Sequence, residues 1–310
     1  MSSKRGGRGQ PQGKQYGPKK TPPAQEPPVV LVQVLLPKGE KSGEFERKMR
    51  RLDPDFDKKI EIINSIYNDY GVRVNMESFM KNPEKFSIEG VLEPFKNSIK
   101  FIKEEIPNFQ NKIIQGSQSF TVNLDLNYDK DISSHVYAQS GPFSGIEFGN
   151  LYTSADVKQK YQNNVDSGFH PKGTTFQDVL THEMGHSIHY ILQNMDYIKK
   201  NPNSSYYDFI VNSHKEHAKH TTTNKIVKRA LQEMGVKGVT YSNLSNYTKE
   251  ISGYAKKNTA EAIAEAISDV RANGTKAKAL SQSIFNVIKG SFKAGGVDAY
   301  IKTSKIKKGK

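Results

Sequence analysis

The sequence predicts an α+β domain, and two observations carry that prediction. Amphipathic segments with helical spacing dominate both ends of the chain, while short alternating segments gather between about residues 116 and 152. Helices that flank a small group of strands, rather than alternating with them, are typical of the α+β class. The 15 Tyr and 15 Phe of the 310 residues can anchor a core of ordinary size.

Most of the positive charge lies at the two ends of the chain. Residues 1–29 carry a net charge of +5 and residues 301–310 another +5, which leaves +4 for residues 30–300. Residues 1–28 are rich in Gly, Pro, Gln and Lys, a composition that predicts a disordered basic tail. The segment 301–310 is predicted to be a second basic tail. Such tails either keep a protein soluble or contact nucleic acid, virion components or another polyanion, and both interpretations stay open.

The apolar segments exclude a membrane span and give no export signal. The longest one, Val29–Leu36, contains Gln33 and stops at Pro37, so it is too short to cross a bilayer and predicts a buried strand. We therefore expect the chain to be cytoplasmic as synthesised. The absence of cysteine means that any bound metal is held by histidine and carboxylate side chains.

Residues 29–115 are predicted to form a mostly helical region. Ser42–Leu52 and Asp55–Tyr70 are amphipathic, with Gly71 placed to end the second helix, and residues 89–105 repeat the pattern.

Residues 116–300 are predicted to form the second region, with strands first and helices after them. The strand candidates are Phe120–Tyr128, His135–Ala138 and Gly145–Tyr152, of which the last is either an edge strand or an internal strand. Helices are expected from Thr174 or Thr175 to about Gln193, and over about 205–219, 224–234, 258–272 and 275–291.

The helix after Thr175 carries the pattern His-Glu-x-x-His. His182 and His186 are four residues apart, so a helix places both imidazoles on one face, where they can bind the same metal ion. Glu183 can reach a water molecule that the metal activates and serve as its general base. His189 is predicted to be a supporting or core histidine, because its distance along the helix from His182 is about 10 Å.

A catalytic zinc ion needs a third protein ligand, and a later helix offers three acids. Asn258 is placed to cap that helix, and Glu261, Glu265 and Asp269 then share one face. Such a stripe suits one carboxylate ligand followed by an acid that orients a histidine. The spacing leaves open which acid is the ligand.

Two family resemblances choose differently between these acids. Glu265 followed by Asp269 resembles the ligand segment of thermolysin. The larger set resembles the gluzincin metallopeptidases of the anthrax lethal-factor-like and Pro-Pro endopeptidase families, through Tyr254, Asn258, Glu261, Ala264 and Glu265. This second resemblance, which we favour because it includes the tyrosine, implies a zincin-like fold over residues 116–300. It further implies that Glu261 is a zinc ligand, that Glu265 supports the ligands and that Tyr254 stabilises the oxyanion.

The loop before the zinc motif carries a further resemblance. Residues 168–173, together with the motif that follows, resemble the peptidase-like domains of phage head proteins and mobile-element polyproteins. His170 lies in this loop and either lines a cleft or stands apart from the site. The 74 residues between His186 and Glu261 depart from the compact members of the family, so substrate specificity is not transferred.

The sequence thus predicts a zinc-dependent endopeptidase that acts on a peptide or protein. The alternative is a virion structural protein that retains the peptidase fold and contacts nucleic acid through its basic tails. A secreted toxin protease is disfavoured by the lack of an export signal. Nucleotide-dependent and serine-hydrolase activities have no supporting motif.

Overall fold

The computed structural model describes residues 42–115 and 118–304. The predictions for residues 1–28 and for the strand Val29–Leu36 lie outside the described residues. Helices dominate and the strands form two small sheets, so the predicted α+β class is confirmed. In the described part of the chain, every helix is too short or too polar to cross a bilayer.

The first helices agree closely with the sequence pattern. They are α1 (Ser42–Leu52), α2 (Phe56–Tyr70), α3 (Met76–Lys81) and α4 (Glu93–Glu105), the last preceded by a π-helical turn over Ile88–Leu92. Gly71 ends α2 with a φ of 68°, a left-handed conformation that glycine adopts without strain. The short α3 was not predicted.

The strands differ from the sequence prediction. β1 (Lys112–Gln115) and β2 (Gln118–Thr121) form an antiparallel hairpin, whereas β3 (Leu126–Tyr128), β4 (Ala138–Gly141) and β5 (Gly145–Phe148) form a sheet in the order β3-β5-β4. The strand predicted over Phe120–Tyr128 is therefore two strands. The Asn123 side chain accepts a hydrogen bond from the Asp125 backbone, and this local turn interrupts the strand. β5 is the internal strand of its sheet, and β4 forms the edge.

The second half of the chain is helical. It contains α5 (Val157–Asp166), α6 (Val179–Lys200), α7 (Tyr206–Ala218), α8 (Thr221–Glu233), α9 (Ser245–Thr248), α10 (Thr259–Asn273), α11 (Ala279–Ala294) and α12 (Val297–Thr303). Helix α5 was not predicted; it buries only three side chains, Val157, Tyr161 and Val165. The first residues of the segment predicted as a basic tail, 301–303, belong to α12.

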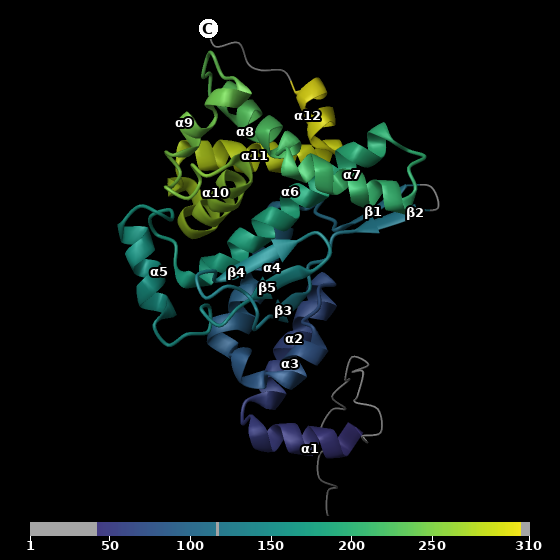
Figure 1. Ribbon diagram of the computed structural model, residues 1–310, viewed down its shortest axis with the longest axis vertical. Coiled ribbons are helices and arrows are strands. Elements are labelled where there is room, and N and C mark those ends of the chain that lie inside the picture. Colours follow the sequence, from purple (N-terminus) through teal and green to yellow (C-terminus); the bar gives the residue numbers. More distant parts are fainter. Residues whose placement is uncertain (1–41, 116–117, 305–310) are drawn as a thin grey trace, which may run out of the picture. The chain divides into compact units, whose positions relative to one another are not determined.

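Helix α6 is central to the packing. The three-stranded sheet lies on one side of it and α10 on the other, with α11 against α10 (Figure 1). One cluster of buried apolar side chains extends from Met49 to Val297, so the predicted regions 29–115 and 116–300 share a core. Phe79, Phe86 and Phe148 are part of it and join α3 to β5 through edge-to-face ring contacts.

The contact between α6 and α10 is unusually close at one point. A Cβ atom on Gly185 would lie 2.7 Å from the Ala264 Cα atom, nearer than such atoms approach in proteins. Glycine on one helix and alanine on the other therefore allow the two backbones to come together. The closeness brings the histidines of α6 within reach of the acids of α10.

Candidate metal centre

A capping box fixes the 3-10 turn Phe176–Asp178, which leads directly into α6. Thr175 donates its hydroxyl to Asp178 and its backbone N–H to the same carboxylate, at 3.2 and 2.8 Å. Thr175 is one of the two residues that the sequence offered as the cap. Arg271 of α10 also donates to Asp178, so the start of α6 is tied to the end of α10. This tie fixes the helix that carries His182 and His186 against the helix that carries the acids.

Helix α10 begins at the predicted cap. The Asn258 side chain accepts a hydrogen bond from the Glu261 backbone N–H at 2.9 Å. Glu261 therefore lies in the first turn, where its carboxylate can turn toward α6.

Three side-chain atoms converge between the two helices. The Nε2 atoms of His182 and His186 are 3.2 Å apart, and each is 3.2 Å from Oε2 of Glu261. In a tetrahedral site with zinc–ligand distances of about 2.0–2.2 Å, neighbouring ligand atoms are about 3.3–3.6 Å apart. The triangle is only slightly tighter than that, so these three residues fit a zinc ion with one coordination position left over.

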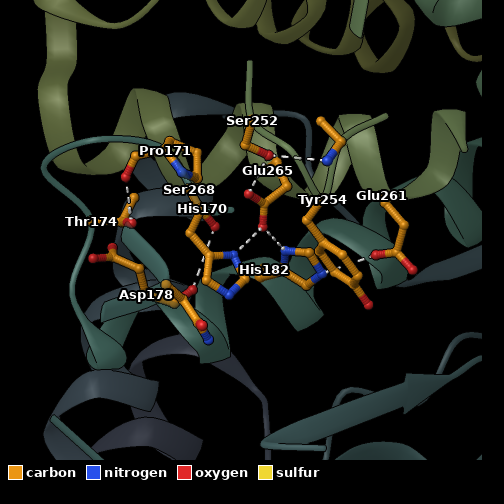
Figure 2. Close-up of polar contacts among 12 residues, drawn as sticks. His170, Pro171, Thr174, Asp178, His182, Ser252, Tyr254, Glu261, Glu265 and Ser268 are labelled. Carbon is orange, nitrogen blue, oxygen red and sulfur yellow. Dashed lines mark hydrogen bonds and ion pairs between the residues drawn. The ribbon is translucent and has the colours of Figure 1, made fainter. Parts of the chain in front are cut away.

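Glu265 lies directly behind His182. Its Oε1 is 2.9 Å from His182 Nδ1 and 3.1 Å from His170 Nδ1, and its Oε2 accepts a hydrogen bond from Ser252 at 2.8 Å. Figure 2 shows both imidazoles turned toward this one carboxylate. A carboxylate behind a ligating histidine fixes the ring orientation and the proton position. Burial raises the pKa of Glu265, but the hydrogen bonds with His170 and His182 outweigh it and lower the value to about 2.

The three acids of α10 differ in which histidine atoms they contact. Glu265 contacts Nδ1 of His182, on the far side of the ring from the atom that faces Glu261. Asp269 accepts hydrogen bonds from Asn273 and from the Lys278 backbone, away from both histidines. Glu261 is thus the acid whose oxygen meets both Nε2 atoms.

The second histidine of the motif has a different partner. His186 Nδ1 is 3.1 Å from Nε2 of His189, which is fully buried. Burial, followed by the charge of neighbouring His186, lowers the pKa of His189 well below its ordinary value and keeps this ring neutral. His186 contacts His189 through Nδ1, so its other nitrogen, Nε2, is the atom directed at His182 and Glu261.

A cavity of about 340 Å³ adjoins His182 and Glu183. Tyr137, Tyr161 and Phe169 form aromatic walls, and Glu183 and His182 are also part of the lining. Burial raises the pKa of the Glu183 carboxyl, so this carboxylate is a stronger base than one in water.

Tyr254 is held beside the site by backbone pairing. Its N–H donates to the Phe169 carbonyl at 2.9 Å, and Gly253 N–H donates to the Gly168 carbonyl at 2.8 Å. The phenol ring lies over His182, with centroids 5.7 Å apart. Burial, and then the charge of Glu261, raises the pKa of Tyr254 to about 12, so the hydroxyl keeps its proton.

The structure brings together all six residues that the sequence selected for the site. It adds three that the sequence analysis did not assign to it: Ser252, His170 as a partner of Glu265, and Lys257, whose Nζ is 3.1 Å from Oε1 of Glu261. His170 and Glu265 are 95 positions apart, so no local pattern could have paired them. Lys257 is one turn before Glu261, a spacing that indicates an ion pair, and this signal was present in the sequence.

Comparison of the chain with protein-family models, with curated proteins and with solved structures finds no match.

Proposed function

We propose that the protein is a zinc-dependent endopeptidase. The observation that carries this proposal is the triangle of donor atoms from His182, His186 and Glu261, each 3.2 Å from the next, beside a buried Glu183. Two imidazoles, once they have released a proton to solvent, and one carboxylate form a donor set that suits zinc.

A zinc ion held there would lower the pKa of a water molecule and polarise the scissile carbonyl. Glu183 follows His182 on the helix and borders the cavity, so it is placed to take a proton from the attacking water. The same carboxyl then returns the proton to the leaving amine. The raised pKa of Glu183 favours the first transfer, because its carboxylate accepts a proton more readily than an exposed glutamate does.

Tyr254 supplies a hydrogen-bond donor for the oxygen of the reacting carbonyl. Its ring covers His182 and its hydroxyl stays protonated at neutral pH. A fixed O–H donor next to the developing oxyanion stabilises charge that exists only in the transition state.

Two features favour a peptide as the substrate. Within the described residues β4 pairs only with β5, so its other edge is open for an extended peptide, and β4 packs against α6. The aromatic-walled cavity is lined by His182, Glu183 and Tyr254, so it can receive a substrate side chain next to the scissile bond.

Replacing Glu183 with Gln tests this proposal. The variant keeps the shape of the side chain and all three donor atoms, so it should bind zinc as the wild type does. It loses the base, and hydrolysis should fall by about 100- to 10,000-fold. Cleavage of a complex peptide mixture, read by mass spectrometry, measures this without knowledge of the natural substrate.

A suitable control is Glu147→Gln, on β5, where the carboxylate accepts a hydrogen bond from Gln139 and does not line the cavity. It should cleave the mixture as the wild type does. Cleavage that persists at the wild-type rate in Glu183→Gln would reject the mechanism.

A further inference from the structure

Lys257 contacts two functional residues of the site at once. Its Nζ atom donates to Oε1 of Glu261 at 3.1 Å and to the Tyr254 hydroxyl oxygen at 3.4 Å, and it lies 5.0 Å from the centre of the Tyr254 ring. The mechanism proposed above assigns it no role. Its side chain is 58% exposed, whereas that of Glu261 is 10% exposed, so the amine reaches the site from the solvent side.

The two oxygens of Glu261 have separate partners. Oε2 faces both histidines, at 3.2 Å from each Nε2 atom, while Oε1 faces Lys257. A carboxylate can bind a metal ion through one oxygen or through both. An ammonium group on Oε1 draws that oxygen toward solvent and favours binding through Oε2 alone. One coordination position is then left open, as a catalytic site requires.

The contact with Tyr254 fixes the direction of a proton. An ammonium group has three N–H donors and no acceptor, so in this pair the phenol oxygen can only accept. The hydroxyl hydrogen of Tyr254 must therefore point away from Lys257.

We propose that Lys257 is a positioning residue, which keeps Oε1 of Glu261 away from the metal position and turns the Tyr254 hydroxyl hydrogen toward the substrate carbonyl. This inference rests on the proposed function, because it assumes that Glu261 binds a metal ion. Lys257 itself contacts neither the metal position nor the reacting atoms. It acts through the two residues that do.

The neighbouring residue provides a matched control. Lys256 is also exposed, and among the described residues it has no ion pair or side-chain hydrogen bond. Lys256→Met and Lys257→Met therefore remove the same charge one position apart. Lys257→Arg retains the charge and the donors, and Lys257→Gln is a second neutral variant should the methionine disturb folding.

The first measurement is the visible absorption of the full chain loaded with Co²⁺, which reports the number of ligands. In wild type, Lys256→Met and Lys257→Arg we expect the intense bands of four-coordinate cobalt. In Lys257→Met and Lys257→Gln both oxygens of Glu261 can bind, and the intensity per cobalt should fall toward that of a five-coordinate ion. Identical spectra in all variants would overturn the inference, whereas a wild type that takes up no cobalt would overturn the proposed function itself.

The second measurement separates positioning from a structural role. Without the nearby cation, Lys257→Met should hold zinc at least as tightly as the wild type in competition with a chelator, because like charges repel. Its kcat, measured with a single peptide chosen from those that the wild type cleaves in the mixture, should nevertheless fall by roughly 10- to 100-fold, as is typical when a partner of the metal site is removed. Zinc binding and kcat that fall together would indicate a structural residue and reject the proposal.

A double-mutant cycle tests the contact with Tyr254. If Lys257 acts through the hydroxyl, Lys257→Met should reduce kcat less in a Tyr254→Phe background than in the wild type. Equal reductions in both backgrounds would remove Tyr254 from the proposal.

Discussion

Two clusters of buried carboxylates lie along α6, and they differ in what faces them. Near the start of the helix, Glu261 and Glu265 meet imidazoles, and hydrogen bonds from these rings outweigh burial and lower the pKa of both carboxyls. Near its end, Asp196 is also buried, but it faces a second acid, Asp298. Burial and that like charge raise the pKa of Asp196 to about 6.

The positively charged side chains that face the two clusters also differ. Asp298 is bound to Lys200 at 2.6 Å and to Lys225 at 2.7 Å, so its charge is already compensated by lysines. The acids at the start of the helix face histidines, with Lys257 as a further partner of Glu261, and a histidine becomes a neutral metal ligand when it releases a proton. A buried carboxylate therefore indicates a metal centre only where its partners are groups such as histidine, which can release a proton and bind a metal cation in its place. Substitutions in and around the two clusters test whether contact with histidine is what distinguishes the first one.

The largest effect is expected from Glu265→Gln. The change keeps the shape of the side chain but removes the charge behind His182, and such partners typically contribute about 10- to 100-fold to metal affinity. Zinc affinity measured by chelator competition should fall by that amount. Asp269→Asn is the matched control, since it removes a buried carboxylate of the same helix that contacts Asn273 and Lys278. Equal losses in the two variants would mean that contact with histidine is not what distinguishes Glu265.

Gly185→Ala should have the next largest effect. The added Cβ atom would lie 2.7 Å from Ala264 Cα, so α6 and α10 must move apart. Overpacking of this kind costs about 1–3 kcal/mol, and we expect the upper part of that range because the obstacle is backbone. Urea unfolding should show lower stability, and zinc affinity should fall with it.

Gly290→Ala is the control for that change. Its Cβ atom would collide with the Tyr300 ring, a side chain that can rotate, far along the chain from the histidines. This variant should lose stability and keep its zinc affinity. If Gly185→Ala also keeps full zinc affinity, the close helix contact is not what assembles the site.

The smallest effect concerns the second cluster. Because folding raises the pKa of Asp196 from 3.8 to about 6, the folded state binds more protons than the unfolded state between these values. The free energy of unfolding should therefore decrease as pH rises from about 4 to about 6 and stay reduced above that. Asp196→Asn should remove this slope and stabilise the protein at pH 7 by roughly 1–2 kcal/mol, less than the whole pKa shift corresponds to, because the amide has one oxygen instead of two to accept from the Asp298 backbone. Urea unfolding at pH 4 and pH 7 measures it, and a variant that is less stable at pH 7 would contradict the assignment.

Much of the candidate site followed from local spacing. His182 and His186 on one helix face, the cap at Asn258 and the position of Glu261 one turn into α10 all depend on contacts within a few residues. The helix bounds of α1 and α2 were also predictable, because their apolar side chains recur with the helical period.

The remaining features depend on residues far apart in the chain. His170 meets Glu265 only because the loop around Phe169 pairs with the backbone at Tyr254. The break in the predicted strand at Asn123 arises from a single side-chain hydrogen bond that alternating hydrophobicity does not record. That β4, and not β5, forms the sheet edge is a matter of strand order, which no local pattern contains.

Metal analysis of the purified protein beside its His186→Ala variant tests the central claim most directly. The variant loses one of three donor atoms that lie 3.2 Å apart, while the contact between His182 and Glu265 remains. We predict one zinc ion per chain in the wild type and none in the variant after dialysis against a weak chelator. Equal metal content in the two proteins, or no metal in either, would contradict a zinc centre at His182, His186 and Glu261.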